Sequence, residues 1–414
     1  KEFVFRMKED QFWSDKTPIT IADALFTYKN VIQNSQFTNP AIQSQFTRIE
    51  INQTRDNEIT VRLPSANSFF IEMFTLGILP KHIYKNVPLP EIANYQDNQV
   101  SSTAIKLDKI DLNNQYQRFY LSSSDQKFIV DVADKPYLKN YNLVLDDSHK
   151  LSEGYSQYSY TLPQYTALFL NLENSFLAKK LHRQAIADAV NKKDLQTKLP
   201  KDTIISRPFF QFENITSIPK TSFSLIKDNL KNSSAFNNLS SNSKIKLSLI
   251  ASKYEDETLN NKTRVVIEHI RENLDKIDIE VIIQLYDFEV FKQILVNKEY
   301  DLALFGHDLG ANFDSYSFWH SSQRFKNGLN VSSYFNPLTD NLLENLRREN
   351  NQSKKIEFAR EINTLLAKDI PAVFLFSTKK HYFIDNKIKN RKILNNYSHP
   401  SDIFYDIEAW QKIN

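Results

Sequence analysis

The stretch "KIDIEVIIQLYDFEVFKQILVNKEYDLALFG", residues 276–306, decides the fold. Its apolar residues predict a strand over 277–287, a helix over 288–298 and a second strand over 300–306. Upstream, "IKLSLIA" (245–251) predicts another strand, and a helical segment joins it to the stretch. Strands that alternate with helices of this length indicate βαβ units and a sheet with parallel strands. We therefore expect an α/β unit whose ligands bind beyond the carboxyl ends of the strands.

The residues after the last of these strands form the expected binding loop. The sequence "FGHDLGANFDSYSFWHSSQ" (305–323) contains two of the chain's five glycines, Gly306 and Gly310, beside aspartates, histidines and a tryptophan. Glycine allows backbone conformations that other residues avoid. We expect these two glycines to turn the backbone sharply, so that a carboxylate faces a cleft.

Composition excludes several classes of protein. With 414 residues, 41% of them hydrophobic and 24% charged, the chain is typical of a globular protein of about two or three domains. Its net charge of +3 comes from interleaved basic and acidic residues, which argues against a nucleic-acid groove. The lack of cysteine excludes disulfides and thiolate chemistry. The few glycines form neither a Walker loop nor a Rossmann fingerprint, and no apolar run reaches the roughly 18 residues of a membrane span.

The beginning of the chain has a different pattern. "KEFVFRM" (1–7) alternates as a strand does, and the segment 47–63 predicts a hairpin. Between them, Thr20 and Asp23 have the capping-box spacing that begins a helix. A chain that opens on a strand rather than on a signal peptide indicates a start in mid-fold.

Several separate motifs resemble one protein family. In chain order they are "FRMKEDQFWSDKTPITIADALFTYKNVI", "LGILPKHI", "YTALFLNL", "FKQILVNKEYDLALFGHDLGANFDSYSFWHSSQ" and "NPLTDNLLENLRRENNQSKKIEFAREINTLLAKDIPAVFLFS". On these residues the chain resembles the family 5 extracellular solute-binding proteins of ABC transporters, the dipeptide and oligopeptide group. Some features depart from the family pattern. Lys16 stands where the family usually has glycine, and a Gly-Thr-Gly-Pro-Tyr segment and the usual N-terminal region are missing.

The resemblance implies an α/β, two-lobed, periplasmic-binding-protein-like fold of type II, similar to cluster C, with a ligand cleft between the lobes. It assigns residues 1–163 to lobe I, residues 164–372 to an inserted α/β lobe II, and residues 373–414 to a return into lobe I. The resemblance also implies that the protein is located outside the cytoplasm, in the periplasm or at the cell surface. There the protein would capture short peptides and deliver them to ABC permease subunits. A lipid anchor outside this chain would be its one membrane association, and neither nucleic acid, cofactor nor metal is expected.

The resemblance also suggests ligand contacts. Asp308 matches the family's amine-binding aspartate, because a carboxylate in a closed cleft forms a charge-assisted hydrogen bond with a peptide ammonium. Asp314 is the second candidate, Asn171 a polar contact, and the strand over 164–172 a partner for the peptide backbone. Three aromatic residues could wall side-chain pockets: Trp319, Tyr316 and Phe313. Structural alternatives stay open, namely a capping aspartate, a structural asparagine hydrogen bond and aromatic residues anchored in the core.

Other functions remain as alternatives. The ligand could be a non-peptide solute such as a metal chelate or a sugar. Residues of metal-ligand type do lie close together, at His307, Asp308, Asn312 and Asp314. They lack the remaining acidic positions of an EF-hand loop, and no His-Glu-x-x-His element occurs. A secreted hydrolase is a further alternative, but Ser321 and Ser322 beside His320 are sequence neighbours and do not make a catalytic triad. We expect no catalysis.

Overall fold

The computed structural model describes most of the chain. The described residues are 2–413 except for 35, 38–41, 44–45, 47, 96–99, 103–104, 113–115, 124–125, 134–140, 146–151, 210–220, 232, 234, 236–242, 256, 310–312, 326–327 and 395–396. Within these ranges, no helix is both long and apolar enough to cross a membrane.

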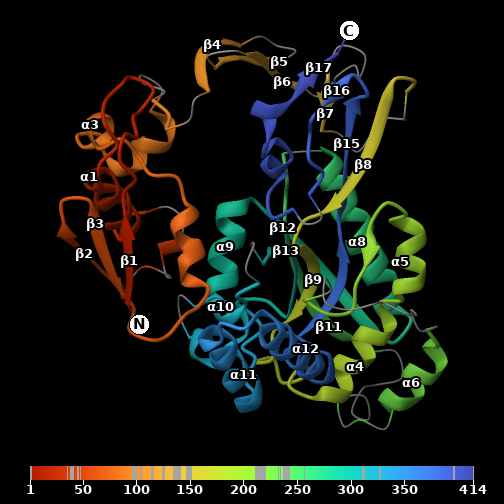
Figure 1. Cartoon of the computed structure of the whole chain (residues 1–414). Coiled ribbons are helices and arrows are strands. Elements are labelled where there is room, and N and C mark those ends of the chain that lie inside the picture. Colours follow the sequence, from red (N-terminus) through yellow and green to blue (C-terminus); the bar gives the residue numbers. More distant parts are fainter. Residues whose placement is uncertain are drawn as a thin grey trace.

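A six-stranded sheet forms the centre of the larger α/β part (Figure 1). Its strands, in spatial order, are β10 (Thr203–Ile204), β14 (Ala372–Ser377), β9 (Gln164–Leu170), β13 (Leu302–Asp308), β11 (Ile245–Ser252) and β12 (Ile279–Tyr286). Strand β11 pairs in parallel with both β12 and β13. Helix α8 (Glu257–Asp275) connects β11 to β12, and α9 (Phe288–Asn297) connects β12 to β13. The predicted βαβ units with parallel strands are therefore confirmed.

Helices cover both faces of this sheet, so its strands are apolar on both sides. In β9, Leu168 and Leu170 face one core, whereas Ala167 and Phe169 face the other. The first core also contains α4 (Lys180–Ala189), α5 (Lys192–Lys198), α6 (Phe223–Lys231) and α8. The second contains α9, α10 (Tyr316–Trp319), α11 (Pro337–Arg348) and α12 (Gln352–Asp369). Burial on both faces explains why "TALFLNL" is a nearly continuous apolar run.

Two segments leave this sheet side by side. Strand β9 follows β8 (Tyr155–Thr161), and β14 is followed by β15 (Lys379–Asp385). Strands β8 and β15 pair with each other over seven residues, in a separate sheet with β7 (Leu143–Val144). The chain therefore passes between the two sheets twice, at 161–164 and at 377–379. The first passage supports the proposed boundary between residues 163 and 164. The second lies after β14, which belongs to the six-stranded sheet, and therefore a few residues later than the proposed boundary between 372 and 373. The division into residues 1–163, 164–372 and 373–414 stays a proposal.

The N-terminal part has its own small sheet and core. Strands β1 (Glu2–Arg6), β3 (Glu58–Arg62) and β2 (Glu50–Arg55) form an antiparallel sheet, which confirms the predicted hairpin. Helix α1 (Ile21–Leu25) begins with the predicted capping box of Thr20 and Asp23, and a π-helix (Phe26–Ile32) continues it. In Figure 1 this part lies on the left, next to α9, α10 and α11.

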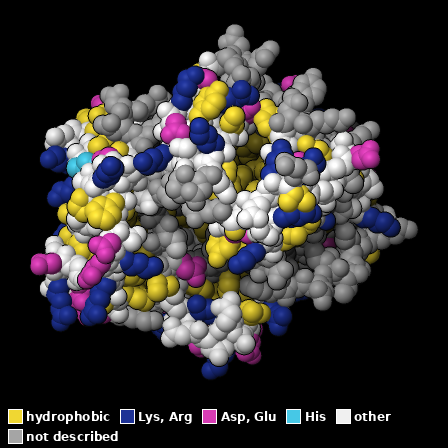
Figure 2. All heavy atoms as spheres, turned by 45° about the horizontal axis from the view of Figure 1, so that its top comes forward, with side chains coloured by type: hydrophobic (Ala, Val, Ile, Leu, Met, Phe, Trp, Pro, Cys, Tyr) yellow, Lys and Arg dark blue, Asp and Glu magenta, His cyan; other side chains and the backbone are white. Residues whose placement is uncertain are grey.

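Short elements complete the described chain. They are α3 (Lys81–Tyr84), the sheet of β4 (Lys106–Leu112), β5 (Tyr116–Ser122) and β6 (Lys127–Ala133), the pair β16 (Ile388–Lys389) and β17 (Gln411–Lys412), and 3-10 turns at Phe70–Thr75, Leu89–Asn94, Ser321–Gln323, Pro400–Phe404 and Ile407–Ala409. On the face shown in Figure 2, lysine and arginine side chains are interspersed with acidic ones, as the sequence suggested.

The structure corrects one expectation about the glycines. Strand β13 continues to Asp308, two residues beyond the predicted end, so Gly306 lies inside the strand and not in a turn. Among the described glycines, Gly154 is the one with positive φ, 85°. The idea that Gly306 bends the backbone is therefore wrong, and Gly310 lies outside the described residues.

Candidate ligand-binding site

A pocket of about 270 Å³ lies where β9, β13 and β14 approach the second sheet. The pocket is lined by Gln164, Tyr165, Thr166, Gly306, His307, Asp308 and Thr378. Gln164 and Asp308 are register partners, and so are Thr166 and Gly306. Since alternate strand residues share a face, Gln164, Thr166 and Asp308 project to one side of the sheet. Polar side chains thus replace the leucines that continue this face in the core.

Asp308 is the exposed acid of this pocket. It is the last residue of β13, and the Gln164 amide Nε2 donates a 2.9 Å hydrogen bond to its Oδ2. Both side chains are exposed. At Gly306, an added Cβ would come within 3.7 Å of the Tyr165 carbonyl oxygen, which is ordinary contact. A side chain of one carbon would therefore fit at Gly306, and the strand pairing with β9 holds the Asp308 carboxylate in place.

His307 projects to the opposite face and is buried. Its Nδ1 lies 2.7 Å from the Tyr165 hydroxyl oxygen. Burial lowers the pKa of the His307 imidazole to about 3. Burial also raises the pKa of the Tyr165 hydroxyl well above its ordinary value. Both groups are therefore neutral near neutral pH. Among the pocket-lining residues of β9 and β13, Asp308 is the one with a charged side chain.

Asp314 is in a different environment from Asp308. Its carboxylate accepts hydrogen bonds from Arg347, with Nε 2.9 Å and Nη2 2.8 Å from Oδ2. The Asp314 side chain is only 8% exposed, and that of Arg347 21%. This forked ion pair fixes the loop to α11. A ligand ammonium at Asp314 would have to compete with the guanidinium, so the geometry favours a structural role.

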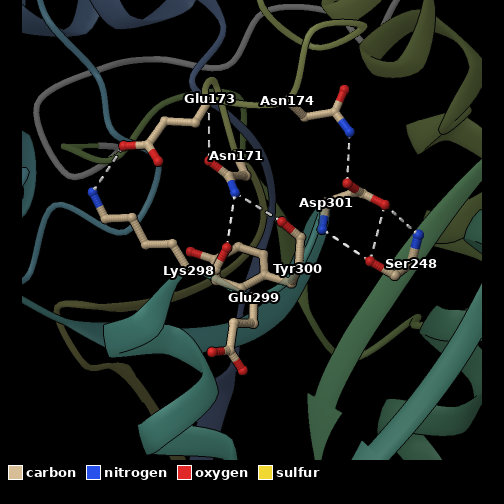
Figure 3. A pocket seen from close by; sticks show the side chains of 8 residues that line it. All are labelled: Asn171, Glu173, Asn174, Ser248, Lys298, Glu299, Tyr300 and Asp301. Carbon is tan, nitrogen blue, oxygen red and sulfur yellow. Dashed lines mark hydrogen bonds and ion pairs between the residues drawn. The ribbon is translucent and has the colours of Figure 1, made fainter.

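The structure does not bring Asn171 to the pocket. Asn171 lies beyond the other end of β9, seven residues from Gln164, which corresponds to about 20 Å along a strand. Figure 3 shows it in a separate polar pocket of about 410 Å³. Its Nδ2 donates to the carbonyl oxygens of Lys298 (3.2 Å) and Tyr300 (2.8 Å). Because Lys298 has a positive φ of 59°, these bonds stabilise the turn between α9 and β13, as the structural alternative for Asn171 expected.

The predicted aromatic contacts are mostly core residues. Trp319 is 1% exposed and packs on Phe169 and Phe374. Phe313 is also buried, against Phe69 and Phe209.

Tyr316 is half-buried, with the Arg347 guanidinium carbon 3.8 Å from its ring centroid. Trp319, Phe313 and Tyr316 therefore fit the alternative of loop residues anchored in the core, and their role as ligand contacts stays a prediction.

We compared the sequence and the structure of the whole chain with those of known proteins. No family model matches the chain. The oligopeptide-binding protein AppA of Bacillus subtilis is 23% identical over 98% of this chain and 80% of its own length. The structure of that protein with a nonapeptide has a TM-score of 0.73, with 18% identity, and covers 100% of this chain and 87% of that chain. AppA of Clostridium difficile gives a TM-score of 0.78, with 20% identity, over 100% and 89% of the two chains.

NikZ of Campylobacter jejuni in complex with Ni(L-His) has a TM-score of 0.71 and 19% identity, over 99% of this chain and 88% of that chain. The oligopeptide-binding relative and these solved structures match the chain along nearly its whole length. The chain has the fold of the family 5 solute-binding proteins. The resemblance and the two-lobed α/β fold expected from the motifs are thereby confirmed.

The solute-binding fold does not assemble the metal-ligand residues named from the sequence. His307 and Asp308 project to opposite faces of β13, Asp314 is paired with Arg347, and Asn312 lies outside the described residues. In the described part of the chain, no group of three or more histidine, aspartate or glutamate residues is arranged to hold a metal ion.

The serines and the histidine that were considered for a hydrolase form structural hydrogen bonds. Ser321 Oγ donates to Asp340 at 2.6 Å. Ser322 Oγ lies 2.8 Å from His320 Nδ1. These contacts cap the turn that follows α10.

Sequence reasoning missed the polar floor of the pocket. Gln164, Thr166 and Thr378 were not singled out, although a signal exists in "PQYTALFLNL". Polar residues at two alternate positions precede an apolar run. That pattern is typical of a buried strand whose first residues on one face are exposed in a cleft.

Proposed function

We propose that this protein is the substrate-binding protein of an ABC importer, which captures short peptides and delivers them to permease subunits. The observation that carries the proposal is the likeness to oligopeptide-binding AppA over 98% of the chain. The exposed Asp308 carboxylate next to the passages between the sheets supports it.

Asp308 is the proposed anchor for the peptide ammonium. A charge-assisted hydrogen bond of this kind contributes about 1.5–3 kcal/mol. Gln164 orients the carboxylate through Oδ2, and hydrogen-bonding capacity of the carboxylate remains for a ligand because each oxygen has two lone pairs.

The backbone of strand β9 is paired on both sides over residues 166–169. The strand pairs with β13 on one side and with β14 on the other. The expectation that the peptide adds to β9 as a strand is therefore wrong over these paired residues.

The proposed cycle uses the two passages of the chain at 161–164 and 377–379 as a hinge. Closure of one lobe on the other would exclude water and strengthen the contact with Asp308. We place the protein outside the cytoplasm, with any lipid anchor outside this chain, and we propose that it does not catalyse a reaction.

The test is mass spectrometry of material released when the freshly purified protein is denatured. We expect short peptides from the wild type and none from Asp308→Asn. Asp228→Asn, which changes an exposed acid on α6, is the control and should keep its peptides.

The other outcomes would contradict the proposal. Release of a metal chelate such as the one bound by NikZ would assign a non-peptide ligand. A protein that releases nothing and gains no thermal stability from peptide mixtures would leave the fold and remove the assigned substrate.

A further inference from the structure

The two edges of the small sheet formed by β4, β5 and β6 differ in how they are protected. Strand β4 is interrupted by a β-bulge and carries four charged residues, Lys106, Asp108, Lys109 and Asp111. Bulges and charges are the features that keep an edge strand from pairing with another chain. Strand β6 instead pairs with β5 in an unbroken register over seven residues. The β6 edge is therefore the less protected of the two.

Side chains on both faces of β6 are exposed. Ile129 is 56% exposed, Val130 40% and Val132 59%. Because successive strand residues point to opposite faces, Ile129 lies on one face and the two valines lie on the other. Their partners on β5, Tyr120 and Phe119, have a strand on either side and are half-buried. The open side of β6 is therefore its edge, and in the described part of the chain no strand pairs with that edge.

The composition and the anchoring of β6 suit it to accept another strand. Its sequence, "KFIVDVA" (127–133), is rich in valine, isoleucine and phenylalanine, which favour strands. Asp131 fixes the strand, because its carboxylate accepts hydrogen bonds from Arg118 Nε and Nη2, both at 2.7 Å, and from the Tyr141 hydroxyl at 2.8 Å. In Figure 1 the sheet lies at the top of the molecule, at the opposite end from α6 and α11. An ordered, apolar edge of this kind is a template for pairing with another chain.

We propose that two copies of this chain associate through the β6 edge, with the two strands antiparallel about a twofold axis at Ile129. The inference is independent of the proposed function. In this register Ile129 lies opposite its own copy, Phe128 lies opposite Val130, and Lys127 lies opposite Asp131. Aromatic residues opposite β-branched ones, and charges of opposite sign, are favourable cross-strand pairs.

Other registers that keep the same residues on each face are less favourable. An axis at Val130 would place Asp131 opposite the apolar Ile129, and an axis at Asp131 would bring two carboxylates together. The interface in the proposed register is small, since it consists of one short strand from each copy. Interfaces below about 1,200 Å² are typical of weak association, so we expect a dimer that dissociates on dilution.

Cysteine cross-linking tests the position of the axis. The chain contains no cysteine, so a single introduced cysteine reports on one position. Opposite residues of antiparallel strands have Cα atoms about 4.5–5.5 Å apart, within the reach of a disulfide. We expect Ile129→Cys to form a disulfide-linked dimer on mild oxidation. Val132→Cys is the matched control, because it is almost equally exposed but lies about 20 Å from its own copy in this register.

Analytical ultracentrifugation measures the association itself. We expect the wild type to shift from monomer to dimer as its concentration rises. Ile129→Lys brings two ammonium groups together at the axis and should weaken association about tenfold or more. Ile282→Lys makes the same change at an exposed position of β12, the edge strand of the six-stranded sheet, and should leave association unchanged. A thermal melt of each variant shows that it folds.

The opposite results would overturn the inference. Wild-type protein that stays monomeric at about 100 μM, a concentration at which weak dimers form, removes the interface. Weakening by Ile282→Lys but not by Ile129→Lys would assign the association to β12 instead. Cross-linking of Val132→Cys as efficient as that of Ile129→Cys would show that the strands do not pair about Ile129. Peptide capture is unaffected by any of these outcomes.

Discussion

At the scale of single residues, strand alternation separates two neighbours of very different chemistry. His307 and Asp308 are consecutive, yet the His307 imidazole is buried and neutral, whereas the Asp308 carboxylate is exposed and accepts a hydrogen bond from Gln164. The buried imidazole and the Tyr165 hydroxyl, on the opposite face of the sheet from Asp308, are both uncharged. A ligand ammonium would therefore meet one negative charge, and no neighbouring positive charge from His307.

The buried imidazole predicts a pH dependence of stability. The pKa of His307 is about 3 in the folded protein and 6.5 in its ordinary state. Below 6.5 the unfolded chain therefore binds a proton that the folded protein does not. The free energy of unfolding should fall as the pH drops from about 6.5 towards 3, by up to about 1.4 kcal/mol per pH unit from this group.

Urea unfolding at pH 7, 5.5 and 4.5 measures this slope in the wild type and in His307→Phe. We expect a shallower slope in the variant, although the buried His182 and His269, whose pKa values burial also lowers, retain their contributions. The exposed His399, replaced by glutamine, is the matched control. Identical slopes for wild type and His307→Phe would show that the imidazole is not buried as described.

At the scale of elements, one ion pair connects the loop after β13 to a helix. Arg347 contacts the Asp314 carboxylate and also lies over the Tyr316 ring. Its sequence neighbour Arg348 makes an exposed ion pair with Glu344, at 2.8 Å on the same helix. The two consecutive arginines of α11 therefore form one largely buried and one exposed ion pair.

Replacement of each arginine by alanine tests this difference. Arg347→Ala leaves the Asp314 charge unpaired in a largely buried position, and should lower the free energy of unfolding by about 3–5 kcal/mol. Arg348→Ala should cost only about 0.3–0.5 kcal/mol, because exposed pairs on helices are weak. Urea titrations give both values, and similar costs would refute the structural role of the Arg347 ion pair.

The elements were predictable from the sequence, but the role of each loop residue was not. The βαβ units follow from apolar runs of 7 to 11 residues separated by helical patterns, which are local signals. The structural role of Asp314 depends on its ion pair with Arg347, which lies 33 positions later in the chain. Likewise, the end of β13 depends on its pairing with Gln164, 144 positions earlier. Such long-range partners leave no local trace in the sequence.

At the scale of the whole molecule, two consecutive phenylalanines belong to different cores. Phe69 and Phe70 are each 2% exposed. Phe70 packs within the N-terminal part, with Phe46 and Phe74. Phe69 instead enters the core of the α/β part, where its ring lies 5.5 Å from that of Phe313.

Further contacts strengthen the attachment at Phe69. The Lys355 ammonium lies 4.1 Å from the Phe69 ring centroid. The Ser68 amide donates to the Arg347 carbonyl oxygen at 2.6 Å. The segment that carries Ser68 and Phe69 therefore attaches the N-terminal part to the α/β part, at Phe313 and at the end of α11.

The last prediction separates attachment from folding. Phe69→Ala should cost about 3–5 kcal/mol of interaction between the two parts while each part keeps its own core. We expect calorimetric unfolding to split into two transitions, and small-angle scattering to report a larger radius of gyration. Phe70→Ala removes a similar buried area inside the N-terminal core, so it should lower the stability of that part without an increase in radius while the protein is folded. If the two variants behaved alike, Phe69 would not be the residue that holds the N-terminal part against the binding loop.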